Sequence, residues 1–285
     1  MVFDPDRLRN WNFGERRQSF EPRDAIIYAL GVGLPITPGE SADLNFLLED
    51  RLRVLPSFAV TLASPGMWPK APELAVDWVK LLHMAQAVEF HRPLPTDASV
   101  TSKPAIVALY DRGAEKGAIC ILRRRVIDAT DGTAYCTIDQ TLALRGNGGF
   151  GGEPMPRVER PVIPLRTPDH LESVFTSERA ALIYRLSGDR NPIHADYQLA
   201  RKAGYQRPIL HGLASYGTAC AVILRAFCHG DPARMKSLNL RFAGVVTPGD
   251  RFDFSCWNDG GCVLFEGKVG DRTVIDQGVA EIVCG

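Results

Sequence analysis

The most informative part of this chain is Tyr184-Arg-Leu-Ser-Gly-Asp-Arg-Asn-Pro-Ile-His194, followed after a gap by Pro208-Ile-Leu-His-Gly212. The first segment places a carboxylate (Asp189), an amide (Asn191) and an imidazole (His194) within six residues. Glycine and Asn-Pro interrupt regular structure, so these side chains are predicted to lie on a turn. A turn can direct Asp189 and His194 at one water molecule, which is an arrangement suited to general acid–base chemistry.

This pattern resembles the signature of the MaoC-like (R)-specific enoyl-CoA hydratases, the hydratase 2 family, which includes the hydratase portion of peroxisomal multifunctional enzyme type 2. The resemblance covers roughly residues 15–283 and continues in Leu82-His83, Arg92-Pro-Leu-Pro95, Gly148-Gly-Phe-Gly-Gly152, Arg241-Phe242 and Thr247-Pro-Gly-Asp250. It implies an α+β double hotdog, in which each of two tandem repeats is a long helix wrapped by an antiparallel sheet. It also implies an enzyme without a cofactor.

Composition excludes several other classes. The 285 residues include 33 basic and 33 acidic ones, so net charge does not favour nucleic acid as a partner. No apolar run is long enough to span a bilayer, and the acidic start does not resemble a signal peptide. Seven cysteines without a CxxC pair suit a reducing compartment, and the C-terminal Ile-Val-Cys-Gly is not a peroxisomal address. We therefore expect a cytoplasmic protein, and because the histidines show no metal-ligand spacing we expect no metal.

The chain repeats itself weakly, which indicates an internal duplication. Residues 25–31 align with 181–187, and Ile138-Asp-Gln140 aligns with Ile275-Asp-Gln277. Phe90 and the turn after it align with Phe242 and its turn. We predict a degenerate N-terminal repeat over residues 1–150 and a catalytic repeat over 151–285, joined by a Gly- and Pro-rich linker at 146–166.

In each half the pattern indicates a helix followed by strands. In the second half an apolar segment rich in small residues predicts a helix over 210–227. Strands are predicted over 237–246, 251–257, 262–269 and 273–283. The first half has Gly33 and Pro35 where the second has Asp189 and Asn191, so we expect one catalytic site per chain.

The resemblance implies the reaction and the roles of the site residues. Water adds to a trans-2-enoyl thioester, with hydroxyl at C3 and a proton at C2, and Asp189 and His194 handle the protons. The N–H of Gly212 would stabilise the thioester oxyanion, since the first turn of a helix has unpaired N–H groups. Asn191 would orient the water or the dyad.

Plainer explanations exist for each of these residues. Asp189 and Asn191 are also typical of an Asx turn, and Gly212 of close packing. We expect His211 to be structural, although it is a second candidate acid–base group. Cys220 and Cys228 are expected to be core thiols.

The resemblance also implies residues that hold coenzyme A. The family's Leu-His-Gly-x-Gln segment is here Leu82-His83-Met84-Ala85-Gln86, with Met84 in place of the glycine. Arg112 would pair with a phosphate, or simply occupy a solvated hairpin. Phe242 would line the ligand, or belong to the core. The run Arg123-Arg124-Arg125 is predicted to be a solvated strand edge.

Three alternatives to the hydratase remain at this point. The same site could serve a dehydratase acting on acyl-carrier-protein or steroid side-chain CoA substrates, or the chain could bind acyl-CoA without catalysis. A thioesterase fits the dyad spacing least well. Because hotdog proteins usually pair, the resemblance implies a homodimer.

Overall fold

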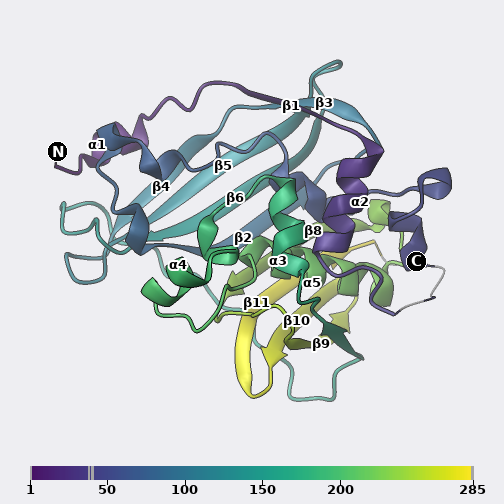
Figure 1. Cartoon of the computed structure of the whole chain (residues 1–285). Coiled ribbons are helices and arrows are strands. Elements are labelled where there is room, and N and C mark those ends of the chain that lie inside the picture. The colour runs from purple at the N-terminus through teal and green to yellow at the C-terminus, as the bar shows by residue number, and fades with distance from the viewer. Residues whose placement is uncertain (1, 38, 40–41, 284–285) are drawn as a thin grey trace.

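The computed structural model describes residues 2–37, 39 and 42–283, and within them an eleven-stranded sheet dominates. Figure 1 shows the strands side by side, with most of the helices in front of the middle of the sheet and one short helix near the N-terminus at its left end. The helices are α1 (Pro5–Arg9), α2 (Pro22–Gly31), α3 (Ala180–Tyr184), α4 (Tyr197–Lys202) and α5 (Gly212–Phe227). The strands of the first half are β1 (Arg16–Phe20), β2 (Leu81–Phe90), β3 (Ala98–Ser102), β4 (Ala105–Asp111), β5 (Ala118–Asp128) and β6 (Ala134–Leu144). Those of the second half are β7 (His170–Phe175), β8 (Met235–Phe242), β9 (Arg251–Asp259), β10 (Cys262–Val269) and β11 (Arg272–Ile282).

The order of the strands repeats across the centre of the sheet. The path is β1-β3-β5-β6-β2-β8-β11-β10-β9-β7, with β4 branching from β5. β2 and β8 pair antiparallel at the junction, and going outward each half meets its strands in the same relative order. Phe90 and Phe242 end the two junction strands, and the two Ile-Asp-Gln segments lie on the strands next to them. This symmetry supports the duplication and confirms the predicted double hotdog.

Helix α5 is the centre of the second half. Every residue from Ala214 to Leu224 is buried, and small side chains let neighbouring elements come close. A Cβ on Gly217 would lie 2.4 Å from Val32 Cγ1, so glycine is required where the end of α2 packs on the helix. The helix begins two residues later than expected because the backbone of His211 is extended, with φ −62° and ψ 136°, and the Leu210 N–H pairs with the carbonyl of Val246. Cys220 and Cys228 are fully buried, as predicted.

The first half departs from the expected plan. Among the residues described there, the longest helix is the ten-residue α2, and short 3₁₀ turns occupy much of the segment from Asp43 to Lys80. One of these turns, Pro56–Thr61, packs against α5 and β6. Prolines at 56, 65, 69 and 72 explain this, since each lacks the N–H that a continuous helix requires. The prediction of a long helix in the first half was therefore wrong.

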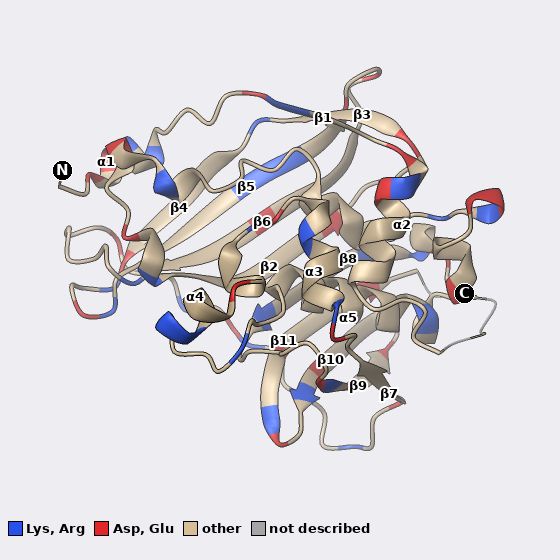
Figure 2. Ribbon diagram, in the orientation of Figure 1, with Lys and Arg blue, Asp and Glu red and all other residues tan. Residues whose placement is uncertain are grey.

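Residues 145–169 form no helix or strand, in line with the predicted linker, while the division at residue 150 stays a prediction. Basic and acidic residues are mixed along the ribbon (Figure 2). Among the described residues no helix combines the length and the apolar character that a membrane span requires.

Candidate active site

The loop after α3 folds as the sequence predicts. A 3₁₀ turn, Arg185–Ser187, ends at Gly188, whose φ of +117° is a conformation that favours glycine. The Asp189 carboxylate then accepts a hydrogen bond of 3.0 Å from the N–H of Asn191. Asn191 Oδ1 accepts one of 3.4 Å from the N–H of Ile193 and caps the 3₁₀ turn Pro192–His194. Asn191 therefore has a structural task, and its catalytic role stays a prediction.

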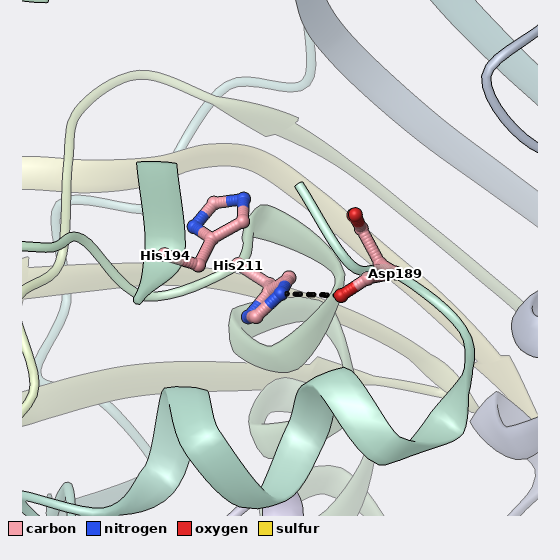
Figure 3. Close-up of side chains that lie close together, drawn as sticks. All are labelled: Asp189, His194 and His211. Carbon is pink, nitrogen blue, oxygen red and sulfur yellow. Dashed lines mark hydrogen bonds between the residues drawn. The ribbon is translucent and has the colours of Figure 1, made fainter. Parts of the chain in front are cut away.

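The loop brings Asp189 and His194 together and places both beside His211, which directly precedes α5 (Figure 3). One possible ligand atom from each of the three side chains lies within 4.8 Å of the others. A single water can contact two polar atoms at that separation, since each hydrogen bond spans about 2.8 Å. Asp189 and His194 are thus close enough to share a water.

Backbone carbonyls fix the protonation of both rings. His194 Nδ1 lies 2.9 Å from the Ile209 carbonyl, so Nδ1 donates and Nε2 keeps a lone pair. His211 Nε2 lies 3.1 Å from the main-chain carbonyl of Asp189, the contact dashed in Figure 3, so Nε2 donates. His211 Nδ1 is buried without a hydrogen-bond partner among the described residues. Each ring thus has one nitrogen that donates to a main-chain carbonyl and one nitrogen that can accept a hydrogen bond.

The two imidazoles stack, and their surroundings keep them neutral. Their ring centroids are 3.7 Å apart, and the centroid of the Tyr184 ring lies 4.8 Å from that of His211. Burial lowers the pKa of His194, although the Ile209 carbonyl and Asp189 oppose this. Burial and then the charge of a protonated His194 lower the pKa of His211. At neutral pH His194 is therefore able to accept a proton. The sequence signal for this neighbour was the His211-Gly212 pair at the start of the predicted helix.

Gly212 is the first residue of α5 and lies against Phe242. The N–H groups of Ala214 and Ser215 bond to the His211 carbonyl, which leaves those of Gly212 and Leu213 as the unpaired donors of the first turn. A Cβ on Gly212 would lie 3.5 Å from the Phe242 ring, an ordinary contact, and the backbone is not left-handed. The fold therefore tolerates a small side chain at this position.

The other predicted ligand contacts lie at the same end of the sheet. The His83 ring meets the Phe242 ring edge-on at 5.0 Å, and burial lowers the pKa of His83 to about 4. Met84 lies at an irregularity of β2, between the paired residues His83 and Ala85, and is half-buried. His83 and Phe242 thus lie together near the helix tip, and Met84 follows His83 along β2.

Arg112 lies farther away, in the exposed turn between β4 and β5. Three strand spacings separate this turn from β2, about 14 Å. The Asp111 carboxylate accepts N–H bonds from Gly113, Gly149 and Gly151, which lower the pKa of Asp111 to about 2. These hydrogen bonds hold the glycine-rich loop against the turn, so the backbone that carries Arg112 is fixed in place.

The arginine run is not the solvated edge that the sequence predicted. β5 is an interior strand, so its side chains alternate between the two faces of the sheet. Arg123 is exposed and pairs with Asp139, and Arg125 is exposed, but Arg124 is 1% exposed. Sequence alone could not show that β4 covers this edge.

Asp189, His194 and His211 also form the one group of described residues close enough to hold a metal ion. The spacing of the histidines along the sequence did not indicate this group, because its members come together only in the tertiary structure. The expectation of no metal stays a prediction.

Two family models match the chain. The MaoC-like domain matches residues 161–279, and the N-terminal domain of MFE-2 hydratase 2 matches residues 18–146. A peroxisomal enoyl-CoA hydratase 2 from Arabidopsis thaliana is 36% identical over 95% of this chain and 92% of its own length. The 3-hydroxyacyl-thioester dehydratase Y of Mycobacterium tuberculosis is 36% identical, covering 92% and 93%.

Solved structures agree with the sequence relatives. A MaoC-like dehydratase from Phytophthora capsici superposes with a TM-score of 0.85 at 31% identity, covering 99% of both chains. The full-length peroxisomal multifunctional enzyme type 2 of Drosophila melanogaster gives a TM-score of 0.79 at 30% identity over 94% of this chain and 48% of that one. The chain therefore belongs to the MaoC-like hydratase 2 family, a family of hydro-lyases.

Proposed function

We propose that the protein is an (R)-specific 2-enoyl-CoA hydratase that reversibly adds water to trans-2-enoyl-CoA to give (3R)-3-hydroxyacyl-CoA. The observation that carries this proposal is the meeting of Asp189, His194 and the first turn of α5 at one point. The family relationship supplies the substrate class. No cofactor enters the proposed reaction.

The chemistry follows from the atoms available. Asp189 and the free Nε2 of His194 hold one water between them and remove a proton from it as its oxygen bonds to C3. That proton is returned through the dyad to C2, so the two hydrogens of the water end on the C3 hydroxyl and on C2. Which of the two groups acts as base and which as acid stays open.

Negative charge develops on the thioester oxygen during this step. The Gly212 N–H, at the positive end of a 16-residue helix, is the donor we propose for it. A preorganised donor of this kind stabilises a transition state by about 3 kcal/mol. The absence of a side chain at Gly212 lets a ligand approach this N–H closely.

We assign substrate positioning to His83, Met84, Phe242 and Arg112. The first three border the helix tip, where the acyl group would lie. Arg112 faces solvent at the same end of the sheet, at a distance that suits a phosphate of coenzyme A better than the reacting carbons. A guanidinium offers a phosphate two parallel hydrogen bonds.

A second candidate function is a dehydratase that acts on acyl-carrier-protein thioesters or on steroid side-chain CoA esters. The similarity to a 3-hydroxyacyl-thioester dehydratase favours it. The site is the same, since the reaction is the reverse one.

The test is loss of absorbance at the enoyl-thioester band with crotonyl-CoA and longer trans-2-enoyl-CoA esters, followed by chiral analysis of the product. We expect (3R)-3-hydroxyacyl-CoA. An (S) product, or tight binding of the esters without any change of absorbance, would contradict the proposal. A marked preference for acyl-carrier-protein or sterol side-chain thioesters would support the second candidate.

We also propose a homodimer in the cytoplasm. Leu171 and Phe175 are large, exposed and on the same face of the edge strand β7, a combination that favours pairing with another chain. Free thiols at the six described cysteines suit a reducing compartment. Light scattering showing a monomer, or cell fractionation placing the protein in an organelle, would contradict these two proposals.

A further inference from the structure

A row of polar side chains crosses the buried face of the first half of the sheet. Gln86 on β2 is in register with Gln140 on β6, and Arg124 projects from β5 on the same face. Apolar side chains lie on both sides of this row. Val88, Val126 and Ile138 belong to the hydrophobic cluster around α5, and Cys120, Leu122 and Leu142 to a second cluster. The polar row therefore separates two apolar regions.

Arg124 is the charged member of the row, and its bonding is incomplete. Nη2 donates to the Val60 carbonyl at 2.6 Å, and Nη1 lies 3.4 Å from Gln140 Oε1. Among the described residues, neither Arg124 Nε nor Gln86 Oε1 has a hydrogen-bond partner, although both atoms are buried. No carboxylate of a described residue forms an ion pair with Arg124. Burial lowers the pKa of Arg124 only to about 10, so a charged guanidinium remains in the interior at neutral pH. A buried charge without a counterion is costly.

The row leads to the proposed active site. His83 lies on the same face of β2 as Gln86, because His83 pairs with Leu142 and Gln86 with Gln140, and the charges of Arg124 and Asp189 shift the pKa of His83 in opposite directions. They act in opposite directions on Tyr184 as well, whose ring packs on His211. His83 also contacts Phe242, which borders Gly212. An acyl chain that leaves the helix tip past His83 would run toward Gln86 and Arg124.

We propose that Arg124 binds a carboxylate at the far end of the acyl chain, so that the enzyme prefers enoyl-CoA esters that end in a carboxylate over alkyl esters of equal length. This inference rests on the proposed hydratase function. A carboxylate supplies the missing counterion and accepts the free Nε–H, and a rotated Gln86 amide offers it a further N–H. A terminal methyl group would leave the guanidinium buried and unpaired.

The test uses pairs of trans-2-enoyl-CoA esters of equal length, one ending in a methyl group and one in a carboxylate, across a series of lengths. For the unmodified protein we expect kcat/KM to favour the carboxylate by tenfold or more at one length, because charged hydrogen bonds contribute about 1.5–3 kcal/mol. Arg124→Met keeps the length of the side chain and should reverse the preference, while hydration of the alkyl ester is retained. Arg125→Met, on the exposed face of the same strand, is the matched control and should change neither rate.

The outcomes separate this inference from the function on which it rests. Hydration of neither ester by the unmodified protein would refute the hydratase proposal itself. Hydration of alkyl esters with no preference for the carboxylate at any length would overturn only the inference. Equal loss of both rates in Arg124→Met would also overturn it, since Arg124 would then serve only to hold the Val60 segment. If that variant does not fold, Arg124→Lys, which keeps the charge, must retain a preference for the carboxylate.

Discussion

Replacing Gly212 with proline removes the N–H group that we assign to the thioester oxyanion, and the structure indicates that α5 should tolerate it. Gly212 is the first residue of the helix, the position at which proline is favoured because its missing N–H would have no intrahelical partner. His211 already has φ −62° and ψ 136°, within the extended range that a residue before proline requires. The added Cβ would be in ordinary contact with Phe242.

The magnitude can be worked out from the donors present. Gly212 and Leu213 carry the two unpaired N–H groups of the first turn, so the substitution removes one of two. Loss of one oxyanion donor costs about 2.7–4 kcal/mol, a factor of 10²–10³ in kcat. The stability cost should stay within about 1 kcal/mol, since no intrahelical bond is lost and glycine is itself unfavourable in a helix.

The assay compares kcat for Gly212→Pro with that for Gly212→Ala, which adds the same Cβ but keeps the N–H. Thermal unfolding and circular dichroism check that both variants fold. We expect the alanine variant to show any cost of crowding, and the proline variant to be a further 10²–10³-fold slower. A folded proline variant as active as the alanine one would refute the assignment of this N–H.

The remaining predictions concern protons, metal and coenzyme A. Burial lowers the pKa of His83 to about 4 and also lowers the pKa values of His194 and His211. In the unfolded chain these three histidines have ordinary pKa values near 6.5 and bind protons below that pH, so falling pH favours the unfolded state. The melting temperature should therefore fall as the pH drops from 6.5 toward 4, and a flat profile there would contradict the burial of these rings. The acid limb of kcat/KM should likewise lie below pH 6.5, because His194 stays neutral to lower pH than a free histidine. Dialysis against a chelator should leave hydration unchanged, whereas loss of activity that Zn²⁺ restores would show that Asp189, His194 and His211 hold a metal. Arg112→Ala should raise KM for the CoA ester several-fold with kcat unchanged, and Arg145→Ala serves as an exposed arginine control; an unchanged KM would return Arg112 to a solvated hairpin.

Local chemistry explains why the turn that carries Asp189 and the helix after His211 could be predicted from the sequence. Gly188 and Asn191-Pro192 specify their turn wherever they occur, and the Asx contact from Asp189 to Asn191 needs no distant partner. The apolar segment before Phe227 likewise specifies a helix by its own composition. These features depend on neighbours in the chain, which the sequence shows directly.

Features that depend on distant partners could not be predicted. Arg124 is buried because it points to the face of the sheet on which the segment carrying Val60 packs, and nothing in the arginine run indicates which face is covered. The stacking of His211 on His194 needs the loop to fold back on α5. The described part of the first half contains no long helix, which its prolines indicated, although the internal repeat predicted one. For the first half, the prolines therefore predicted the structure better than the internal sequence repeat did.

The central claim is that the carboxylate of Asp189 and the imidazole of His194 act on one water as a unit. The most direct test is kcat/KM for Asp189→Asn, His194→Ala and the double variant, with Asp271→Asn in an exposed turn as control. Each single variant should lose about 10²–10⁴-fold. The double variant should be about as slow as the worse single one, since groups that act together are not additive. Losses that multiply, or a single variant with full activity, would contradict the account.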